Sequence, residues 1–475
     1  MEPSGQIRIY NTLSGEKETF KPLEAGRIRM YVCGPTVYDY IHIGNARPLV
    51  FFDVVRRYFE WSGYEVRYVV NFTDVDDKLI RRAAETGMTV PEVADMYIRA
   101  YFEDADALGV RRATVHPRVT ETIPDIIAFI DALVKSGHAY ESGGDVFFRV
   151  SSFPDYGKLS KQKIESLQAG ARVEIDERKE NPHDFVLWKA AKPGEICWPS
   201  PWGEGRPGWH IECSAMIRKY LGETIDIHGG GIDLVFDLPF PHHECEIAQS
   251  ESLTGRPLAN YWMHNGYLNV NHEKMSKSLG NVVNVRDLLK TTSRQAIRFV
   301  ILSTHYRNPL NYHGEALRQA ENGLQRIANC LIGLRHRLSV VLDGEPDAEI
   351  EAELQAIRER FRAQMNDDFN TPEAITALFD LTSLANRVLA RPVATKATLE
   401  RLLAQFREFD EVLGLLPDES DVAPLLDEEV ERLIRERAEA RRRKDWATAD
   451  AIRNLLTERG IVLEDTPQGV RWKRK

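Results

Sequence analysis

The spacing of apolar residues near the N-terminus changes from that of a strand to that of a helix and back. Ile28, Met30 and Val32 alternate with other residues, as in a strand, and Gly34 stops the pattern. From Ala46 a helix is predicted, because apolar residues recur at helical spacing at Val50, Phe51, Val54, Val55 and Tyr58. A second β-rich run covers residues 64–72. This order predicts the start of a doubly wound (Rossmann-type) α/β domain.

Ligands of doubly wound domains bind at the carboxyl ends of the strands, here in the loop that holds Cys33 and residues 42–45. The loop contains neither GxGxxG nor GxxxxGK[ST], so we expect no dinucleotide or P-loop phosphate cradle. A helix N-terminus attracts anions, and His42 adds an imidazole. The alternative reading of this stretch is a tight turn with a surface histidine.

Farther along, the pattern predicts an interruption of this domain and then its return. Helices and a hairpin are predicted at 91–108, 122–136 and 139–150. Residues 116–200 lose the alternation of strand and helix and are interpreted as an insertion, after which the core resumes at 208–216. A strand at 224–227 leads to His228-Gly229-Gly230-Gly231, whose glycines let backbone approach a ligand. Asp233 beside them is a candidate acceptor for ribose hydroxyls, or part of a plain turn.

The C-terminal part of the chain reads as helical. A buried seam of a helical bundle is predicted from the spacing of Leu317, Ala320, Leu324, Ile327, Leu331, Leu334 and Leu338. From residue 425 the chain is locally basic, with Arg441 to Lys444 next to Trp446. Basic residues beside tryptophan suit phosphate contacts and base stacking, although an amphipathic helix with a solvated charged face fits the same pattern.

Composition limits the class of protein. The 475 residues suffice for about three domains, and 43% hydrophobic with 28% charged residues is ordinary for a globular protein. No apolar run has the ~20 residues that a membrane helix needs, and no signal peptide is visible. Five scattered cysteines indicate a reducing, cytoplasmic compartment with thiols free or on metal. The net charge of −10 means that any RNA contact comes from local patches.

Four residues from separate parts of the chain are candidate metal ligands: Cys33, Cys213, His242 and Glu246. His242 and Glu246 are one turn apart on one face of a predicted helix, and all four are expected at one face of the sheet. Two thiolates, an imidazole and a carboxylate suit Zn²⁺. Buried structural cysteines and a satisfied histidine are the competing interpretation.

Lys274-Met275-Ser276-Lys277-Ser278 places two lysines on a short loop, where they are able to neutralise a polyphosphate. Alone, such a string is usually a solvated basic loop. HIGN at 42–45 followed later by KMSKS resembles the two signatures of class I aminoacyl-tRNA synthetases, and the ordered pair is far more specific than either half.

The whole chain resembles the bacterial cysteinyl-tRNA synthetase family. The motifs that carry the resemblance are YVCGPTVYDYIHIGNAR (31–47), NFTDVDDK (71–78), GWHIECSAM (208–216), DIHGGG (226–231), PHHECEIAQS (241–250), KMSKSLGN (274–281), MNDDFNTPEA (365–374) and a C-terminal run at 443–472. The resemblance implies ATP-dependent activation of L-cysteine and its transfer to the terminal adenosine of cysteine tRNA by a monomer. It also implies one zinc per subunit, held by the four candidate ligands to select the thiol, and Mg²⁺ with ATP.

The resemblance and the loop positions together suggest further site residues. His42, Asn45, Lys274 and Lys277 are the expected catalytic residues, and the ATP-binding set is His42, Gly44, Asn45, Gly230, Asp233, Lys274 and Lys277. Cysteine-binding residues are expected at Gly34, Thr73 and Trp209. Anticodon contacts are expected at Arg441, Trp446, Asp450, Arg453 and Asp465, although exposed aspartates on helices are usually only solvated.

The expected architecture is a Rossmann-type catalytic domain with an insertion, then a helical bundle and a small anticodon-binding domain. Its predicted bounds are 1–115 and 201–285 (catalytic), 116–200 (insertion), 286–315 (stem contact), 316–415 (bundle) and 425–475 (anticodon). Three departures from the family pattern stand out: Asn45 replaces a histidine, Cys245 replaces an asparagine and is a possible competing ligand, and the tract before Pro241 is about four residues longer. Alternatives are a cysteine ligase of mycothiol synthesis, which shares the catalytic motifs, and a non-catalytic tRNA-binding zinc protein.

Overall fold

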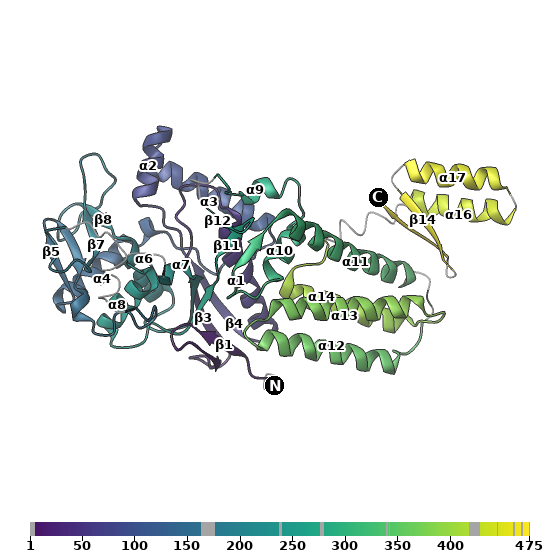
Figure 1. Cartoon of the computed structure of the whole chain (residues 1–475), viewed down its shortest axis with the longest axis horizontal. Helices are drawn as coiled ribbons and strands as arrows, with labels where there is room; N and C mark the ends of the chain where they lie inside the picture. The colour runs from purple at the N-terminus through teal and green to yellow at the C-terminus, as the bar shows by residue number, and fades with distance from the viewer. Residues whose placement is uncertain are drawn as a thin grey trace. The chain divides into compact units, whose positions relative to one another are not determined.

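The computed structural model divides the chain into two compact units, Met1–His313 with Ala363–Pro372, and Gly314–Arg362 with Glu373–Lys475 (Figure 1). It describes residues 5–162, 176–236, 240–275, 280–338, 341, 343–417, 428–443, 445–458, 461–466 and 469–474. Among the helices of these residues, none has both the length and the apolar character to cross a membrane.

The first unit is built around a parallel four-stranded sheet. Its strands are β3 (Arg27–Val32), β4 (Glu65–Val70), β9 (Ile225–Gly231) and β10 (Ala259–Asn265), in the order β10-β9-β3-β4. The chain runs from β3 outward to β4 on one side and from β9 outward to β10 on the other, so the order reverses between β3 and β9. A ligand crevice is expected at this switch point, and the predicted doubly wound fold is confirmed.

Helix α1 (Ile43–Trp61) links β3 to β4 and begins three residues before the predicted start at Ala46. The sequence pattern missed this turn because His42 caps it through its side chain rather than through an apolar contact. The strand predicted at 224–227 extends farther than expected, since the HGGG residues belong to β9 itself. The other elements of this part of the unit are β1 (Arg8–Asn11), β2 (Glu16–Thr19), α2 (Asp77–Thr86), α3 (Val90–Ala107), α6 (Trp209–Tyr220), α7 (Asp233–Phe236), α8 (His242–Thr254), β11 (Leu268–Val270), β12 (Glu273–Lys274), α9 (Val285–Leu288), α10 (Arg294–Leu302) and β13 (Leu310–Tyr312).

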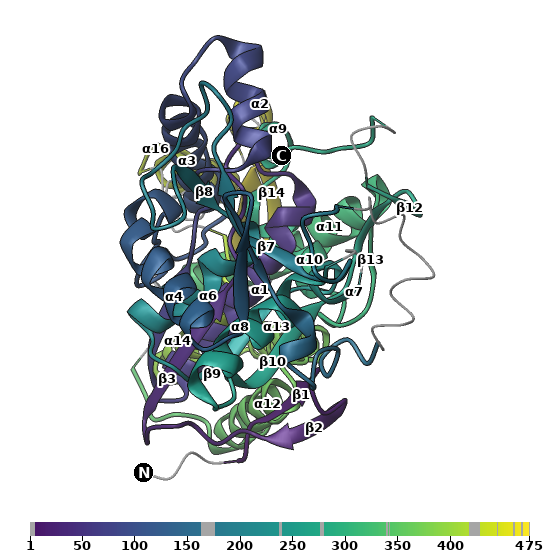
Figure 2. The same cartoon turned by 90° about the vertical axis from the view of Figure 1, so that its left-hand side faces the viewer.

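The segment predicted as an insertion (116–200), together with the residues that follow it as far as Pro207, forms an antiparallel sheet beside α4 (Ile123–Lys135), at the end of the unit that faces the viewer in Figure 2. Its strands, in the order β5-β6-β7-β8, are β5 (Ala139–Ser142), β6 (Asp145–Phe148), β7 (Phe185–Ala190) and β8 (Gly205–Pro207), with short 3-10 turns at Val119–Glu121 and Val150–Ser152. Gly143 and Gly144 have φ of 63° and 86°, which suits the two-residue hairpin turn predicted there. Together, α4, α6 and α8 share a core with β6 and β7, which joins the insertion to the helices of the candidate metal ligands.

The second unit is helical and then mixed. Its elements are α11 (Gly314–Leu338), α12 (Ala348–Asn366, whose last residues belong to the first unit), α13 (Thr371–Ala390), α14 (Lys396–Leu413), α16 (Glu428–Arg442), α17 (Trp446–Glu458), β14 (Ile461–Thr466) and β15 (Gly469–Arg474). Ala320, Leu324, Ile327 and Leu331 of α11 are buried, as the predicted seam requires, and Cys330 beside them is a buried core residue. The finer domain bounds derived from the sequence stay predictions.

Candidate metal and nucleotide site

Two strands and two helices bring the four predicted metal ligands together. Cys33 directly follows β3, and its backbone N–H donates to Gly229 of β9 at the switch point. Cys213 lies in α6, while His242 and Glu246 lie one turn apart at the start of α8. Cys213, His242 and Glu246 are almost fully buried, and Cys33 is half-buried. The extra residues before Pro241 therefore do not displace His242 from this group.

The distances within this quartet fit a tetrahedral ion. Cys33 Sγ lies 3.8 Å from Cys213 Sγ, and Cys213 Sγ lies 3.5 Å from His242 Nε2. Glu246 Oε1 lies 2.9 Å from His242 Nε2 and 3.4 Å from Cys33 Sγ. Tetrahedral zinc with Zn–S of about 2.3 Å and Zn–N of about 2.0 Å places two sulfurs about 3.8 Å apart and sulfur and nitrogen about 3.5 Å apart. The donor set and its spacing are thus compatible with a bound metal.

The electrostatics of the quartet favour anionic ligands. Burial alone would raise the pKa of Glu246, but His228 and His242 hold that pKa well below its usual range. A hydrogen bond from Cys33, helped by His242, lowers the pKa of Cys213 to about 6. Burial, with the negative charges of Cys213 and Glu246, raises the pKa of Cys33. The site thus holds one thiolate readily and the second only with further positive charge, which a divalent ion supplies.

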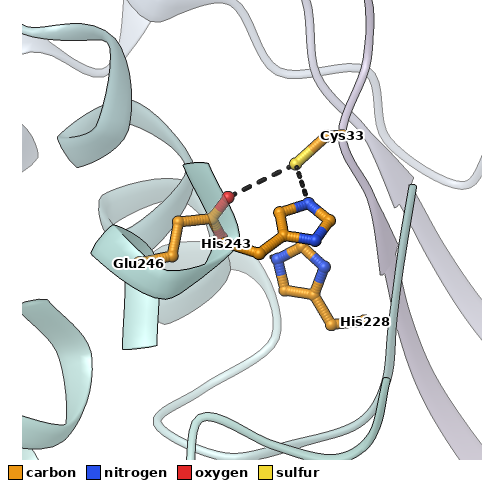
Figure 3. A group of neighbouring side chains, drawn as sticks. All are labelled: Cys33, His228, His243 and Glu246. Carbon is orange, nitrogen blue, oxygen red and sulfur yellow. Dashed lines mark hydrogen bonds and ion pairs between the residues drawn. The ribbon is translucent and has the colours of Figure 1, made fainter. Parts of the chain in front are cut away.

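A second group of four possible ligands shares Cys33 and Glu246 and adds His228 and His243 (Figure 3). His243 Nε2 lies 3.2 Å from Cys33 Sγ, and His228 Nε2 lies 2.6 Å from Glu246 Oε2. The His228 ring stacks on Trp262. In the first quartet, Glu246 uses its other oxygen, so His228 is suited to orient that carboxylate from behind.

More histidines extend this layer, and sequence reasoning missed them. His243 Nδ1 lies 2.8 Å from His264 Nε2, and His264 Nδ1 lies 2.8 Å from Thr12 Oγ1. On the other side, His210 Nδ1 lies 3.0 Å from His242 Nδ1. The available signal was the density of histidines in the motifs, since His210 lies in the motif of Cys213, His243 lies in the motif of His242 and Glu246, and His228 lies in the DIHGGG motif.

A cavity of about 420 Å³ opens at the carboxyl ends of the strands and has Cys33 in its lining. His42 caps α1: its Nδ1 accepts from the N–H of Asn45, while Asn45 Oδ1 accepts from the N–H of His42. A Cβ on Gly44 would lie 2.7 Å from Met275 Cε, so the first turn of α1 lies against the start of the KMSKS segment. The predicted ATP residues His42, Gly44, Asn45 and Asp233 line this cavity.

The remaining residues of the predicted ATP-binding set are Gly230, Lys274 and Lys277, and the structure describes them only in part. Gly230 lies in β9, packed against His243 and Leu234. Lys274 contributes its backbone to β12, but its side chain and the whole of Lys277 lie outside the described residues.

Two of the predicted cysteine-binding residues lie close to the metal ligands. The Trp209 ring is centred 4.3 Å from that of His242 and lines a neighbouring cavity of about 970 Å³. Gly34 lines the nucleotide cavity, and its N–H donates to Asn71 Oδ1. Thr73 instead donates its hydroxyl to Glu212 Oε2 at 2.8 Å. Glu212, which the sequence reasoning did not single out, leaves its buried Oε1 without a partner in the structure.

The possibility that Cys245 competes for the metal finds no support in its surroundings. Its thiol lies 3.3 Å from the Tyr156 hydroxyl, and burial raises its pKa well above the ordinary value. Neither group of possible ligands among the described residues includes it. Cys245 points elsewhere because it is displaced about 100° around α8 from Glu246.

The predicted anticodon residues lie in the C-terminal helices and hairpin. Trp446 is 58% exposed at the start of α17. Asp450 and Arg453 pair with each other at 3.8 Å on the same helix, and Arg441 is exposed near the end of α16. Asp465 lies in β14, and its side chain is not among those described.

Comparison with known proteins places these features in a family. The model described as tRNA synthetases class I (C) catalytic domain matches residues 19–322, a DALR domain matches 360–417, and the cysteinyl-tRNA ligase anticodon binding domain matches 423–472. The chain is 56% identical to the cysteine–tRNA ligase of Geobacillus thermodenitrificans (strain NG80-2) over 469 residues, which are 98% of this chain and 99% of that protein. The chain belongs to the cysteinyl-tRNA synthetase family. The corresponding ligase of Shouchella clausii (strain KSM-K16) is also 56% identical, over 98% of this chain and 99% of its own.

Solved structures of other synthetases share the fold at low identity. The Mycobacterium tuberculosis methionyl-tRNA synthetase with methionyl-adenylate superposes with a TM-score of 0.61 at 15% identity, over 82% of this chain and 92% of that one. The leucyl-tRNA synthetase of an Agrobacterium radiobacter K84 complex superposes with a TM-score of 0.61 at 12% identity, over 83% of this chain and 85% of that one. The match to the anticodon-binding model favours a cysteinyl-tRNA synthetase over the two alternatives weighed from the sequence, because a ligase that acts on a small sugar needs no such domain and a pure binder needs no catalytic domain.

Proposed function

We propose that this cysteinyl-tRNA synthetase works in two steps at the β3–β9 switch point. The carboxylate of L-cysteine attacks the α-phosphate of ATP, which forms cysteinyl-adenylate and releases pyrophosphate. A ribose hydroxyl of the terminal adenosine of cysteine tRNA then takes the cysteinyl group and releases AMP. The observation that carries the proposal is Cys33, which belongs to the metal-compatible quartet and also lines the adjoining cavity.

We assign one zinc ion per chain to Cys33, Cys213, His242 and Glu246, on the donor types and the spacing given above. When bound, zinc is a Lewis acid that binds a thiolate firmly and a neutral hydroxyl weakly. Selection of this kind is needed because apolar contacts separate close analogues such as cysteine and serine by only about 10–200-fold. His228, by holding Glu246, and His210, by holding His242, keep two ligand side chains in place.

The remaining roles are assigned from the family resemblance, together with position for the residues that the structure describes. The free N–H groups at the start of α1, with His42 and Asn45, are assigned to the α-phosphate side, where they stabilise developing charge. Lys274 and Lys277 are assigned to the β- and γ-phosphates together with Mg²⁺. Gly230 and Asp233 are assigned to the adenosine half of the nucleotide.

Trp209, Gly34 and Thr73 are assigned to the cysteine pocket. Trp209 supplies an apolar wall, Gly34 lets backbone approach the substrate, and Thr73 acts through Glu212. For tRNA, we assign the anticodon to the segment 425–475, with Trp446 stacking on a base and with Arg441, Arg453, Asp450 and Asp465 providing polar contacts. The segment 286–315 is assigned to contact with the tRNA stem, and the segment 316–415 to the helical bundle. The enzyme is proposed to act as a monomer.

Cysteine-dependent ATP–pyrophosphate exchange by the full-length protein tests this function. Zinc-replete enzyme is expected to exchange with cysteine and not with serine, to lose exchange after metal removal, and to regain it with zinc. Lys277→Ala is expected to slow exchange while the protein keeps its metal. An absence of cysteine-dependent exchange in zinc-replete protein would overturn the proposal.

A further inference from the structure

Arg47, five residues into α1, is a buried cation beside the HIGN loop. Only 2% of the surface of Arg47 is exposed to solvent. Burial lowers the pKa of Arg47 to about 10, so the guanidinium remains charged at neutral pH. No carboxylate of the described residues pairs with it. A buried charge of this kind needs other partners, because desolvation is costly unless hydrogen bonds replace water.

The partners of Arg47 are five backbone carbonyl oxygens from two separate segments. Nη1 donates to Gly266 at 2.7 Å and to Tyr267 at 2.6 Å. Nη2 donates to Asn308 at 2.5 Å, to Tyr306 at 3.0 Å and to His305 at 3.4 Å. The planar guanidinium presents several donors in a fixed fork, so it is able to hold two chain segments at once.

These two segments lead into a pair of strands. Tyr267 precedes β11, which turns back into β12, while Asn308 precedes β13, which pairs with β11 in parallel. The segments cross closely: a Cβ on Gly266 would lie 2.7 Å from the carbonyl oxygens of both Arg307 and Asn308. Carbonyl oxygens crowded in this way repel one another, and the guanidinium offsets that repulsion.

The 305–308 segment is itself fixed from its other side. The Tyr306 hydroxyl and Arg307 Nε donate to the carboxylate of Asp368, at 2.7 and 2.8 Å. The Tyr306 ring stacks on Phe51 of α1 with centroids 4.2 Å apart. Arg47 therefore connects the rest of the crossing to a segment that already has a fixed position against α1.

The crossing forms one wall of the nucleotide cavity. Gly266, Tyr267, Leu268 and Met275 line that cavity together with His42, Gly44 and Asn45. Arg47 follows the HIGN residues on α1 and holds the segments that carry Gly266 and Tyr267, so one side chain joins two parts of the cavity lining.

We propose that Arg47 is a positioning residue for adenylate formation, which fixes the base of the β11–β12 hairpin against the HIGN end of α1. The proposal rests on the function proposed above, in which this cavity takes ATP and β12 leads into the KMSKS segment. Arg47 touches no reacting atom; it sets the spacing of the two walls that do.

The test is ATP–pyrophosphate exchange by full-length, zinc-replete Arg47→Lys enzyme. Lysine keeps the charge but lacks the fork, so kcat is expected to fall about 10²-fold, the penalty typical of a misplacement of about 1 Å. The KM for ATP is expected to rise, while the KM for cysteine and the metal content stay at wild-type values. A merely structural role would shift all of these together.

Arg57→Lys is the matched control, since Arg57 is a buried arginine of the same helix that is ion-paired with Asp53. It is expected to lower Tm without the ATP-specific loss. Gly266→Ala, which pushes the crossing apart with Arg47 intact, is expected to reproduce the kinetics of Arg47→Lys, and the double variant should show less than additive loss. Wild-type kinetics in Gly266→Ala, or equal effects of Arg47→Lys and Arg57→Lys, would overturn the proposal. Absence of exchange in the wild-type enzyme would instead overturn the function on which it rests.

Discussion

Cys33 Sγ and Cys213 Sγ lie 3.8 Å apart, although 180 residues separate them in the chain. Cys33 directly follows β3, and Cys213 lies on α6, the helix that follows the insertion. This separation equals that of two thiolates on one tetrahedral zinc, about 3.8 Å. The two halves of the catalytic fold therefore meet at a pair of sulfur atoms.

Cys213→Ser is expected to remove the metal and cysteine activation together. A serine hydroxyl is a poor ligand where a thiolate is needed, so zinc affinity should fall more than about 10²-fold, beyond the usual effect of an outer-shell change. Cys245→Ser makes the same chemical change at a buried thiol that contacts Tyr156 instead, and should keep its metal. Metal analysis of both purified variants decides the matter, and full occupancy in Cys213→Ser would contradict the ligand set.

His228→Ala is expected to weaken zinc binding by about 10–100-fold, because Glu246 loses the partner that orients it. The measurement is competition with a chromogenic chelator. His138→Ala is a suitable control, since His138 is hydrogen-bonded to Ser152 in the insertion. An unchanged affinity in His228→Ala would show that the carboxylate is held by other contacts.

His116 is expected to make stability depend on pH on the acid side. The N–H of Ala113 donates to its Nε2 while its Nδ1–H donates to Val70, so both nitrogens are satisfied only in the neutral ring. Burial lowers the pKa of His116 to about 4, from an ordinary value of 6.5. Because folding lowers the pKa of this base, the unfolded chain binds more protons than the folded protein at pH values between the two pKa values. Its stability contribution is therefore complete above pH 6.5 and is lost as the pH falls toward 4.

Between pH 7.5 and 5.5 this loss amounts to about 1.4 kcal/mol. His116→Gln is expected to be less stable than wild type at pH 7.5 and to lose less Tm on acidification. Because the two proteins share their metal ligands, the difference between their Tm shifts isolates His116. Equal shifts would refute the assignment.

Trp446→Ala is expected to weaken tRNA binding without changing cysteine-dependent exchange. An exposed indole that stacks on a base contributes about 1–3 kcal/mol, which corresponds to about 5–150-fold in Kd. Trp472, by contrast, packs against the small core of the same domain, so Trp472→Ala should lower the stability of that domain. Filter binding with cysteine tRNA and exchange assays on each variant separate the two effects. Unchanged tRNA affinity in Trp446→Ala would exclude stacking.

Much of this fold and site is readable from the sequence because the signals are local. Cys33 follows a strand that the alternation of Ile28, Met30 and Val32 defines, and the HHECE motif fixes His242 and Glu246 on one face of a helix. Because ligand-binding residues of a doubly wound sheet gather at its switch point, Cys33 is expected near His242 and Glu246 even when no contact between them is known.

The unpredicted residues depend on packing between distant elements. His243 follows His242 directly, yet it turns toward Cys33 and His264 only because of how α8 lies on the sheet. Arg47 follows the HIGN motif, where a charged residue reads as solvated, and only the crossing of two later segments buries it. The spacing of residues within one segment does not predict contacts between segments that are distant in the sequence.

The ligand quartet runs from residue 33 to residue 246, so a growing polypeptide lacks a complete set until more than half of it has been synthesised. An N-terminal fragment that stops within the insertion holds a single thiol of the set and has no means to retain the ion. Under the zinc assignment proposed above, metal binding is consequently a late event that requires the nucleotide-binding fold to have closed. A ribosome-bound intermediate stalled before Glu246 should remain protease-sensitive around β3, whatever the zinc supply.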